Sequence, residues 1–369
     1  MKLYLPDYLE EIILHKIKKI DTIKLSKYVY SLTEDLIEIR ESYFNDERKL
    51  LGYFAFFFPQ SYLKLKYILE EIDFFFPEQF ANPTQIICDI GSGIGPSTIS
   101  LYDFFKKRNI GSEIFSIEKN KNAFEFQNIL LEECLNLKNN SQKISLKNKS
   151  LEELVSEKKE KFTLIVLSLV LGEVLNQRGK RKAFNIIKEA IKKLLDENGI
   201  LIIVEPATHS NSRNLINFRD EIIKSNPAYP ILPCFHKNTC SIFPDKDDWC
   251  ISTIPWEPPD FMKEINKYLW RDIGYLKFSY LVLKKGKFSS DINYLRALTP
   301  FLKEKGKGKV VVCSEKGKKI FERLERDQSE SNREIETTWR GAVLGIENYE
   351  KKANFFRLKK DSKVKIFTF

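Results

Sequence analysis

The sequence has no run of apolar residues long enough to cross a membrane. A membrane-spanning helix needs roughly 20 such residues. The best stretch, residues 163–175, is interrupted by Ser168 and ends at Gly172 and Glu173. The first 21 residues contain acidic side chains and no arginine, unlike a secretory signal or a mitochondrial presequence. We therefore expect no membrane partner, and a cytoplasmic location, or the mitochondrial matrix if the source is eukaryotic.

Cysteine is scarce, with six residues in 369. Without a secretory signal, so few cysteines argue against a disulfide framework, because a reducing compartment favours free thiols, thiolate metal ligands or catalytic thiols. We therefore expect no disulfide-linked partner.

The excess positive charge is confined to the end of the chain. Residues 284–369 contain 22 Lys and Arg against 12 Asp and Glu, which accounts for the whole net charge of +10. A concentrated basic segment is typical of a surface that binds a polyanion. Solvated lysines without a partner are the alternative interpretation.

The order of apolar patterns predicts an α/β protein. Residues 1–80 favour helices, notably 6–20 and 61–76, and their aromatic run "YFAFFFP" is expected to be a packing surface. From residue 85, strands alternate with helices, which implies a parallel sheet. The predicted strands are 85–90, 113–118, 143–148, 162–168, 199–205, 278–284 and 309–313; the predicted helices are 96–107, 122–137, 150–157 and 180–195. We expect residues 207–277 to be irregular, and the last two strands to complete the sheet.

A glycine-rich loop, "CDIGSGIGPST", follows the first strand and opens a helix. Gly91, Gly93 and Gly95 allow a tight turn and a close approach to a nucleotide-like ligand. Asp89 precedes the loop and Glu118 ends the second strand, where a carboxylate can accept hydrogen bonds from ribose hydroxyls. The pattern resembles the Rossmann-like S-adenosylmethionine-dependent methyltransferases, so these five residues are our predicted cofactor-binding set. A nicotinamide enzyme or a non-binding fold is the alternative.

Four cysteines suggest a metal site. Cys234, Cys240 and Cys250 lie in the loop-like stretch "LPCFHKNTCSIFPDKDDWC", and Cys313 ends the strand "KVVVC". Three thiols from a loop and one from a strand can supply four ligands. The spacing fits zinc or an iron–sulfur cluster equally well, and His236 could replace one cysteine.

The cysteines also have other interpretations. Cys88 and Cys134 are expected to be buried free thiols, as cysteines commonly are. Cys234 and Cys240 follow Pro233 and Thr239 and are superficially similar to the cysteine pairs of RNA cytosine-5 methyltransferases. In those enzymes the two cysteines follow different strands, whereas here both follow the fifth, so a metal site is favoured.

Most of the chain from about Tyr53 resembles one family. The similar fragments are "YFAFFFPQSYLKLKYIL", "IGSGIGPSTIS", "LIVLSLVLGEV", "LIIVEPAT", "PCFH…C…DWC", "KFSYLVLKK", "GKVVVCSEKGK" and "TTWRG". In this order they resemble the small-ribosomal-subunit assembly factors typified by the mitochondrial methyltransferase-like protein seventeen. The resemblance implies a bound [4Fe–4S] cluster with Cys234, Cys240, Cys250 and Cys313 as ligands, and association with the RNA of the small ribosomal subunit.

We therefore expect a Rossmann-like class I methyltransferase sheet with additions. The expected segments are an N-terminal helical region (1–80), an S-adenosylmethionine-binding core (81–231), a cysteine-rich cluster-binding insertion (232–277), and late strands with a basic C-terminal extension (278–369).

The sequence contains one candidate catalytic side chain. The fourth strand leads into "SLVLGEV" without an Asp/Asn-Pro-Pro-aromatic motif, and Glu173 is the ionisable side chain in this stretch. Glu173 is a candidate base, or a carboxylate favoured by a helix start. For RNA, the lysines of "LKEKGKGKVVV", Lys303, Lys305, Lys307 and Lys309, are the predicted contacts. The alternative function is a methyltransferase for a small molecule or protein, with zinc as a structural metal.

Overall fold

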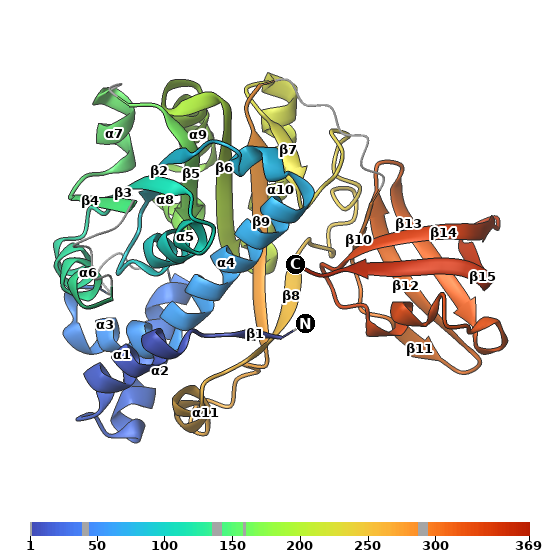
Figure 1. The fold of residues 1–369 in the computed structure, drawn as a ribbon, viewed down its shortest axis with the longest axis horizontal. Helices are drawn as coiled ribbons and strands as arrows, with labels where there is room; N and C mark the ends of the chain where they lie inside the picture. The colour runs from blue at the N-terminus through green and yellow to red at the C-terminus, as the bar shows by residue number, and fades with distance from the viewer. Residues whose placement is uncertain (1, 39–43, 135–141, 158–159, 287–293) are drawn as a thin grey trace. The chain divides into compact units, whose positions relative to one another are not determined.

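The computed structural model describes residues 2–38, 44–134, 142–157, 160–286 and 294–369 (Figure 1). The chain divides into two compact units. The first contains Met1–Ile203 and Pro255–Leu276, and the second contains Val204–Ile254 and Lys277–Phe369. The chain thus leaves the first unit, returns to it once and ends in the second.

Helices precede the sheet of the first unit, as predicted. They are α1 (Asp7–Ile17), α2 (Thr22–Glu38), α3 (Glu47–Phe56) and α4 (Phe58–Phe75), followed by a short 3-10 helix, Pro77–Phe80. Phe54, Phe56 and Phe58 are at most 1% exposed, and the rings of Phe54 and Phe58 meet edge to face at 5.1 Å. These phenylalanines are therefore core residues, as expected of the run "YFAFFFP".

A parallel sheet forms the centre of the first unit. Its strands are β2 (Thr84–Ile90), β3 (Gly111–Ile117), β4 (Gln142–Lys147), β5 (Phe162–Ser168) and β6 (Leu195–Pro206), in the order β4-β3-β2-β5-β6. The intervening helices are α5 (Pro96–Lys107), α6 (Lys121–Cys134), α7 (Leu151–Glu157), α8 (Val170–Arg178) and α9 (Lys180–Leu194). This alternation confirms the α/β, Rossmann-like class; the end of the helix predicted at 122–137 lies outside the described residues.

The register brings three strand ends together. Ile90, the last residue of β2, pairs in parallel with Ile117 of β3 and with Leu167 of β5. The loops that follow these strands therefore leave from one edge of the sheet. In open α/β sheets this edge is where ligands bind.

The chain returns to the first unit through β8 (Ser252–Glu257) and α11 (Asp260–Asn266). β8 pairs in parallel with the short strand β1 (Leu3–Tyr4), with Leu3 opposite Trp256. The N-terminus is therefore paired with a segment more than half the chain away.

The expectation that 207–277 is irregular was wrong. The second unit begins with a helix, α10 (His209–Ser225), and a strand, β7 (Tyr229–Leu232), that pairs antiparallel with β9 (Tyr275–Lys284). The Thr208 hydroxyl accepts a hydrogen bond from the backbone N–H of Asn211 and so caps α10. The buried side chains of α10 recur at helical spacing: Leu215, Ile216, Phe218 and Ile222.

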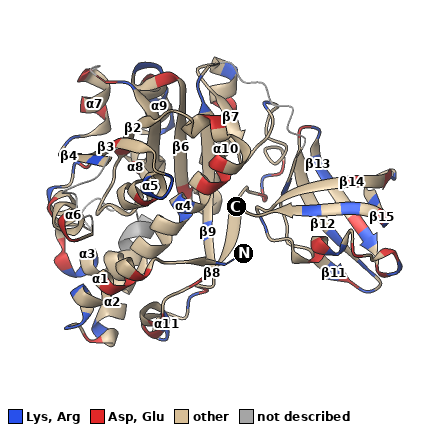
Figure 2. Ribbon diagram, viewed as in Figure 1, with Lys and Arg blue, Asp and Glu red and all other residues tan. Residues whose placement is uncertain are grey.

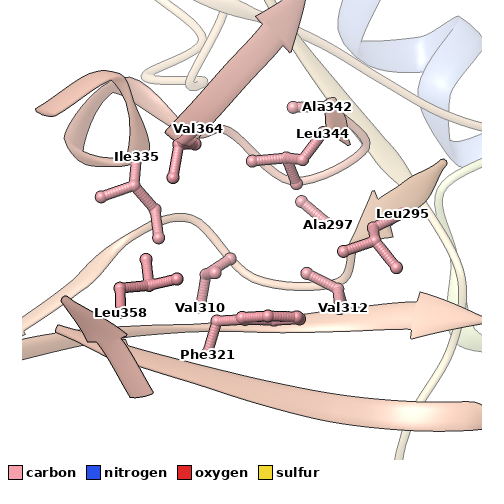
Figure 3. Packing of buried hydrophobic residues seen from close by; sticks show 10 residues of the cluster. All are labelled: Leu295, Ala297, Val310, Val312, Phe321, Ile335, Ala342, Leu344, Leu358 and Val364. Atoms are coloured by element: carbon pink, nitrogen blue, oxygen red, sulfur yellow. The ribbon is translucent and has the colours of Figure 1, made fainter. Parts of the chain in front are cut away.

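The rest of the second unit is a small barrel. Its strands are β10 (Leu295–Ala297), β11 (Leu302–Glu304), β12 (Lys307–Ser314), β13 (Gly317–Leu324), β14 (Val343–Lys351) and β15 (Phe356–Phe367). Their order is β10-β14-β15-β13-β12-β11, and β10 also pairs with β12, which closes a ring of five strands. Ten buried side chains, shown in Figure 3, fill the interior.

The prediction that the strand "KVVVC" completes the parallel sheet was therefore wrong. This strand is β12, whose partners are β10, β11 and β13. Its residues alternate between half-buried and buried, and Val310 and Val312 face the barrel core. A strand buried on both faces would not alternate in this way, so the pattern is that of a barrel strand.

Candidate functional site

A cavity of about 490 Å³ opens at the edge where β2, β3 and β5 end. Most of the described residues that line it come from the loops after these strands and from the starts of α7 and α8, and others come from the N-terminal helical region. They include Ile90–Gly93, Glu118–Asn120, Lys149–Glu152 and Ser168–Val170. A cavity of this size suits a nucleotide-like cofactor.

The glycine loop shapes one wall of the cavity. Gly91, Gly93 and Gly95 all have positive φ angles, of 69°, 55° and 94°. A Cβ atom on Gly91 would lie 2.5 Å from Cγ2 of Val170, so a larger residue does not fit there. Gly91 and Gly93 line the cavity, whereas Gly95 precedes α5 and lies against Gln127.

Glu118 holds the loop in place and reaches the cavity. Its Oε2 accepts a hydrogen bond from the N–H of Gly93 at 2.8 Å, and its Oε1 accepts one from the N–H of Asn120 at 2.7 Å. Burial raises the pKa of Glu118, while the two backbone hydrogen bonds oppose that rise. Each carboxylate oxygen has a second lone pair, so Glu118 can also accept hydrogen bonds from hydroxyl groups of a ligand.

Asp89 lies beneath the loop rather than in the cavity wall. It is fully buried, and its Oδ2 accepts a hydrogen bond from the Thr98 hydroxyl at 2.6 Å. The Thr98 hydroxyl also contacts Oγ of Ser116, and Nε2 of Gln127 donates to both hydroxyls. Asp89 therefore joins the end of β2 to α5. It does not line the cavity, but it lies beneath the glycine loop that does.

The four predicted cysteines lie around one cavity in the second unit. Cys234, Cys240 and Cys250 come from the loop between β7 and β8, and Cys313 comes from β12. Nε2 of His236 lies 3.7 Å from Sγ of Cys313. The sequence separates these thiols by up to 79 positions, and the fold brings them together.

Two buried arginines border this cysteine cavity. Arg219, from α10, is 2% exposed and donates to the carbonyl oxygens of His236 and Asn238. Arg296, from β10, is 4% exposed and donates from Nε to the carbonyl of Pro233 at 3.0 Å. Arg219 also forms an ion pair with the buried Asp220, at 2.5 Å, so less of its charge is available to offset that of thiolates. Sequence reasoning missed both, because a lone arginine has no motif that marks it as buried.

A family model for the mitochondrial small ribosomal subunit protein Rsm22 matches residues 47–328. The chain belongs to the Rsm22 family. All the predicted site residues, from Asp89 to Cys313, lie within the matched residues. The search of curated proteins found no match.

Solved structures resemble the Rsm22-family chain distantly. A candidate RNA methyltransferase from Pyrococcus horikoshii is 12% identical, with a TM-score of 0.37 over 62% of this chain and 85% of that one. A candidate class I S-adenosylmethionine-dependent methyltransferase from Listeria monocytogenes is 11% identical, with a TM-score of 0.38 over 77% and 87%. A precorrin-6y C5,15-methyltransferase from Geobacter metallireducens is 10% identical, with a TM-score of 0.35 over 57% and 84%. These TM-scores are too low to support an argument, so the fold class is assigned from the strand order of the sheet.

Glu173 lies in the first turn of α8 and on the wall of the first cavity. Its Oε1 is 2.7 Å from Nζ of Lys119 and accepts a hydrogen bond from Nε2 of Gln177 at 2.9 Å. One of its oxygens is therefore occupied by neighbours. This pairing supports the interpretation of Glu173 as a structural carboxylate and leaves only Oε2 for a ligand.

The helical region contributes a wall that sequence reasoning missed. Phe44 and Tyr53 both line the first cavity, and their rings meet edge to face at 5.5 Å. The Phe44 ring is also 3.4 Å from where a Cβ of Gly93 would lie. Tyr53 begins the run "YFAFFFP". Its hydroxyl among phenylalanines was the one feature of the sequence that could have marked this position as facing a polar cavity.

In the Rsm22-family chain the four cysteines of this site are free thiols. Burial, reinforced by Cys234, raises the pKa of Cys240 to about 12 and that of Cys313 to about 11, and raises the pKa of Cys250 well above its usual value. A metal would have to displace these protons. Among the described residues, no group of three or more His, Cys, Asp or Glu side chains is already spaced for a metal ion. The ligand set stays a prediction.

Three further features concern the free thiols, His236 and the helices. All six cysteines are free; Cys88 is buried on β2, and Cys134 is half-buried at the end of α6. Burial and the charge of Arg219 lower the pKa of His236 to about 4, so its ring is neutral at pH 7. In the described part of the chain, no helix is long and apolar enough to cross a membrane.

Asp89 should make stability depend on pH. Burial raises its pKa to about 7, so between about pH 4 and 7 the folded state binds a proton that the unfolded state has lost. Stability should therefore fall as pH rises through this window and level off above it. Asp89→Asn should reduce the decline and, by urea denaturation, stabilise the protein by up to about 4 kcal/mol at pH 8 relative to its effect at pH 4. Asp361→Asn, at an exposed position, should keep the decline; an unchanged slope in Asp89→Asn would contradict the assignment.

Proposed function

We propose that this protein is a factor of the small ribosomal subunit that binds S-adenosylmethionine, carries an iron–sulfur cluster and contacts ribosomal RNA. The observation that carries the proposal is that the Rsm22 family match, residues 47–328, contains every residue proposed to bind a cofactor or the cluster. Membership of the family supports the ribosomal role. The geometry of each site supports its cofactor.

For S-adenosylmethionine, the proposed contacts follow from the loop and Glu118. Gly91 and Gly93 would let the backbone approach the methionine part, and Glu118 would accept hydrogen bonds from the ribose hydroxyls. Asp89 and Gly95 would support the loop from below, as their positions outside the lining residues indicate. The bound cofactor would supply an electrophilic methyl group, and ribosomal RNA is the proposed acceptor class.

For the cluster, the proposed ligands are Cys234, Cys240, Cys250 and Cys313. Four thiols line one cavity, with Arg296 on its wall and Arg219, which is paired with Asp220, in the adjacent pocket. This donor set is that of a four-thiolate group. The family resemblance favours [4Fe–4S] over zinc. With all four positions taken by protein, such a cluster would have a structural role.

For RNA, the proposed contact is the basic C-terminal segment. Lys303 and Lys305 are exposed. Lys307 lies 2.7 Å from Glu322, and Lys309 lies 2.6 Å from Glu304, so these two lysines are partly neutralised within the chain. Lys303 and Lys305 are therefore the stronger phosphate contacts of the predicted four.

Binding to small-subunit ribosomal RNA should weaken steeply with salt. Each phosphate contact releases counterions, so raising the salt from about 50 to 200 mM should lower the affinity of the full-length protein by about tenfold or more. Fluorescence anisotropy with a labelled fragment of that RNA measures this. An affinity that did not change over this range would rule out binding through the basic segment.

A further inference from the structure

The five-stranded ring of the barrel has a recognisable connectivity. Taken in chain order as β10, β12, β13, β14 and β15, the first three strands pair antiparallel in succession. The third and fifth pair in parallel, and the fourth pairs antiparallel with both the fifth and the first. This is the connectivity of the OB-fold. Such barrels bind oligonucleotides on the face of their second and third strands, between the loops that join strands one to two and four to five.

Fold alone does not assign a function, so the side chains on that face must decide. Lys309 on β12 pairs with Glu322 on β13, and Glu322 pairs with Arg357 on β15. Glu322 also forms ion pairs with Lys307 at 2.7 Å and with Arg357 at 2.8 Å. A single carboxylate thus holds two cations in fixed positions on the outside of three adjacent strands.

Apolar side chains lie beside this charged row. Ile320, two residues before Glu322 on β13, is 37% exposed, and Leu302, opposite Lys309, is 36% exposed. Phe355 is half-buried, and the guanidinium of Arg357 lies 5.1 Å from its ring centroid. Phe355 belongs to the loop between the fourth and fifth strands.

The cysteine loop covers the far end of the same face. Lys318, opposite Cys313, forms ion pairs with Asp248 at 2.7 Å and Asp245 at 3.3 Å. Val311 packs on the cluster that contains Ile242. The open part of the face therefore runs from the hairpin of β11 to the loop at Phe355.

The open part has a net positive charge. Figure 2 shows Lys and Arg along β12 and β15. Its cations are Lys303, Lys305, Lys307, Lys309 and Arg357, and its carboxylates are Glu304 and Glu322. Exposed apolar side chains next to excess positive charge suit single-stranded nucleic acid, because unpaired bases stack on apolar and aromatic side chains while phosphates contact the cations.

We propose that this open face, from Leu302 and Lys303 through Ile320 to Phe355 and Arg357, binds a single-stranded segment of RNA. The inference rests on the proposed contact with ribosomal RNA and specifies the form of RNA recognised. Bases stack on Phe355 and pack on Ile320, and the β11 hairpin and Arg357 hold the phosphates. A duplex keeps its bases stacked inside and gains only the phosphate contacts.

The test uses the full-length protein and fluorescence anisotropy with two probes of about 12 nucleotides, a single-stranded oligouridine and an RNA duplex, since one OB barrel covers about 4–16 nucleotides. The wild type should prefer the single strand. Phe355→Ala should lower the single-strand affinity about 5-fold to 100-fold and change the duplex affinity little. Trp270→Ala removes an aromatic side chain that is 89% exposed in the first unit and should have no effect.

A second variant tests the phosphate contacts and should not disturb the packing of the barrel. Lys303→Ala with Lys305→Ala changes two exposed lysines and should reduce the salt slope of single-strand binding by about 1.4. The same replacement at Lys19 and Lys182, which are exposed in the first unit, should leave the slope unchanged.

The outcomes separate two failures. If the wild type bound no small-subunit RNA at low salt, the proposed function would fall. If it bound that RNA but preferred the duplex probe, or if folded Phe355→Ala bound the single strand like the wild type, only the single-strand inference would fall.

Discussion

Replacing Cys313 by serine should leave the anaerobically purified protein without its cluster. We expect wild-type protein to be brown and to contain about four iron and four sulfide per chain, and the variant to be nearly colourless with less than about one iron. Cys313 is the one proposed ligand from a strand, and serine is a poor ligand for iron. Absorbance spectra with iron, sulfide and zinc analysis measure the outcome; zinc without iron in the wild type would overturn the cluster.

The same variant tests whether the site orders its loop. Structural metal sites contribute on the order of 10 kcal/mol, so Cys313→Ser should lower the thermal midpoint and expose residues 233–251 to proteases. The loop has other ties, since Arg213 donates to the carbonyls of Phe243 and Asp245, both at 2.9 Å. We therefore expect faster cleavage rather than complete unfolding of the second unit.

Cys134→Ser is the matched control. Cys134 is a half-buried thiol on α6 of the first unit. It should retain iron, colour and protease resistance. If Cys134→Ser lost iron as completely as Cys313→Ser, or if Cys313→Ser kept it, the proposed ligand set would be wrong.

Replacing Gly91 by alanine should abolish most cofactor binding. The new Cβ would lie 2.5 Å from Cγ2 of Val170, and the residue has a φ of +69°, which costs an L-residue roughly 1–2 kcal/mol. The loop must move, and Gly93 then loses its hydrogen bond to Glu118. We expect the affinity for S-adenosylhomocysteine, measured by isothermal titration calorimetry, to fall at least about tenfold, or about 1.4 kcal/mol.

Two further variants separate strain from collision. Gly179 has a φ of +73° and a ψ of 158°, a conformation that is nearly restricted to glycine, and a Cβ atom added there would have nothing within 4 Å. Gly179→Ala therefore carries a backbone cost without a collision and should bind the cofactor normally. Adding Val170→Ala to Gly91→Ala removes the colliding methyl and should restore part of the affinity, relative to Val170→Ala by itself. Equal binding by wild type and Gly91→Ala would refute the cofactor assignment of this loop.

The first unit could be predicted from local patterns. The helix at 96–107 and the strand at 162–168 were predicted with the bounds that the structure has, because Pro96 fixes a helix start and a fully buried parallel strand is a continuous apolar run. The positions of Gly91 and Glu118 around the cavity followed from the same strand–loop–helix order.

The barrel and the buried arginines could not be predicted in this way. The run of valines in "KVVVC" has the composition of a central strand of a parallel sheet. Only the strands that pair with it show that its alternate residues face the core of the barrel. Arg219 and Arg296 become part of the cysteine site through contacts far apart in the chain. Asp89 was predicted to bind the cofactor, whereas it lies beneath the loop and outside the cavity lining. Whether a carboxylate faces the ligand or the core depends on side-chain direction, which spacing does not give.

The interrupted course of the chain sets an order of events during synthesis. The strands of the large sheet are complete at Lys284, the end of β9, whereas the cysteine cavity needs Cys313. Cys313 is made 63 residues after Cys250, which at about 5–20 residues per second takes about 3–13 s. During that interval three thiols exist without their fourth partner while the cofactor cavity can already form. A nascent chain would therefore become able to bind its small cofactor before it could close its metal site.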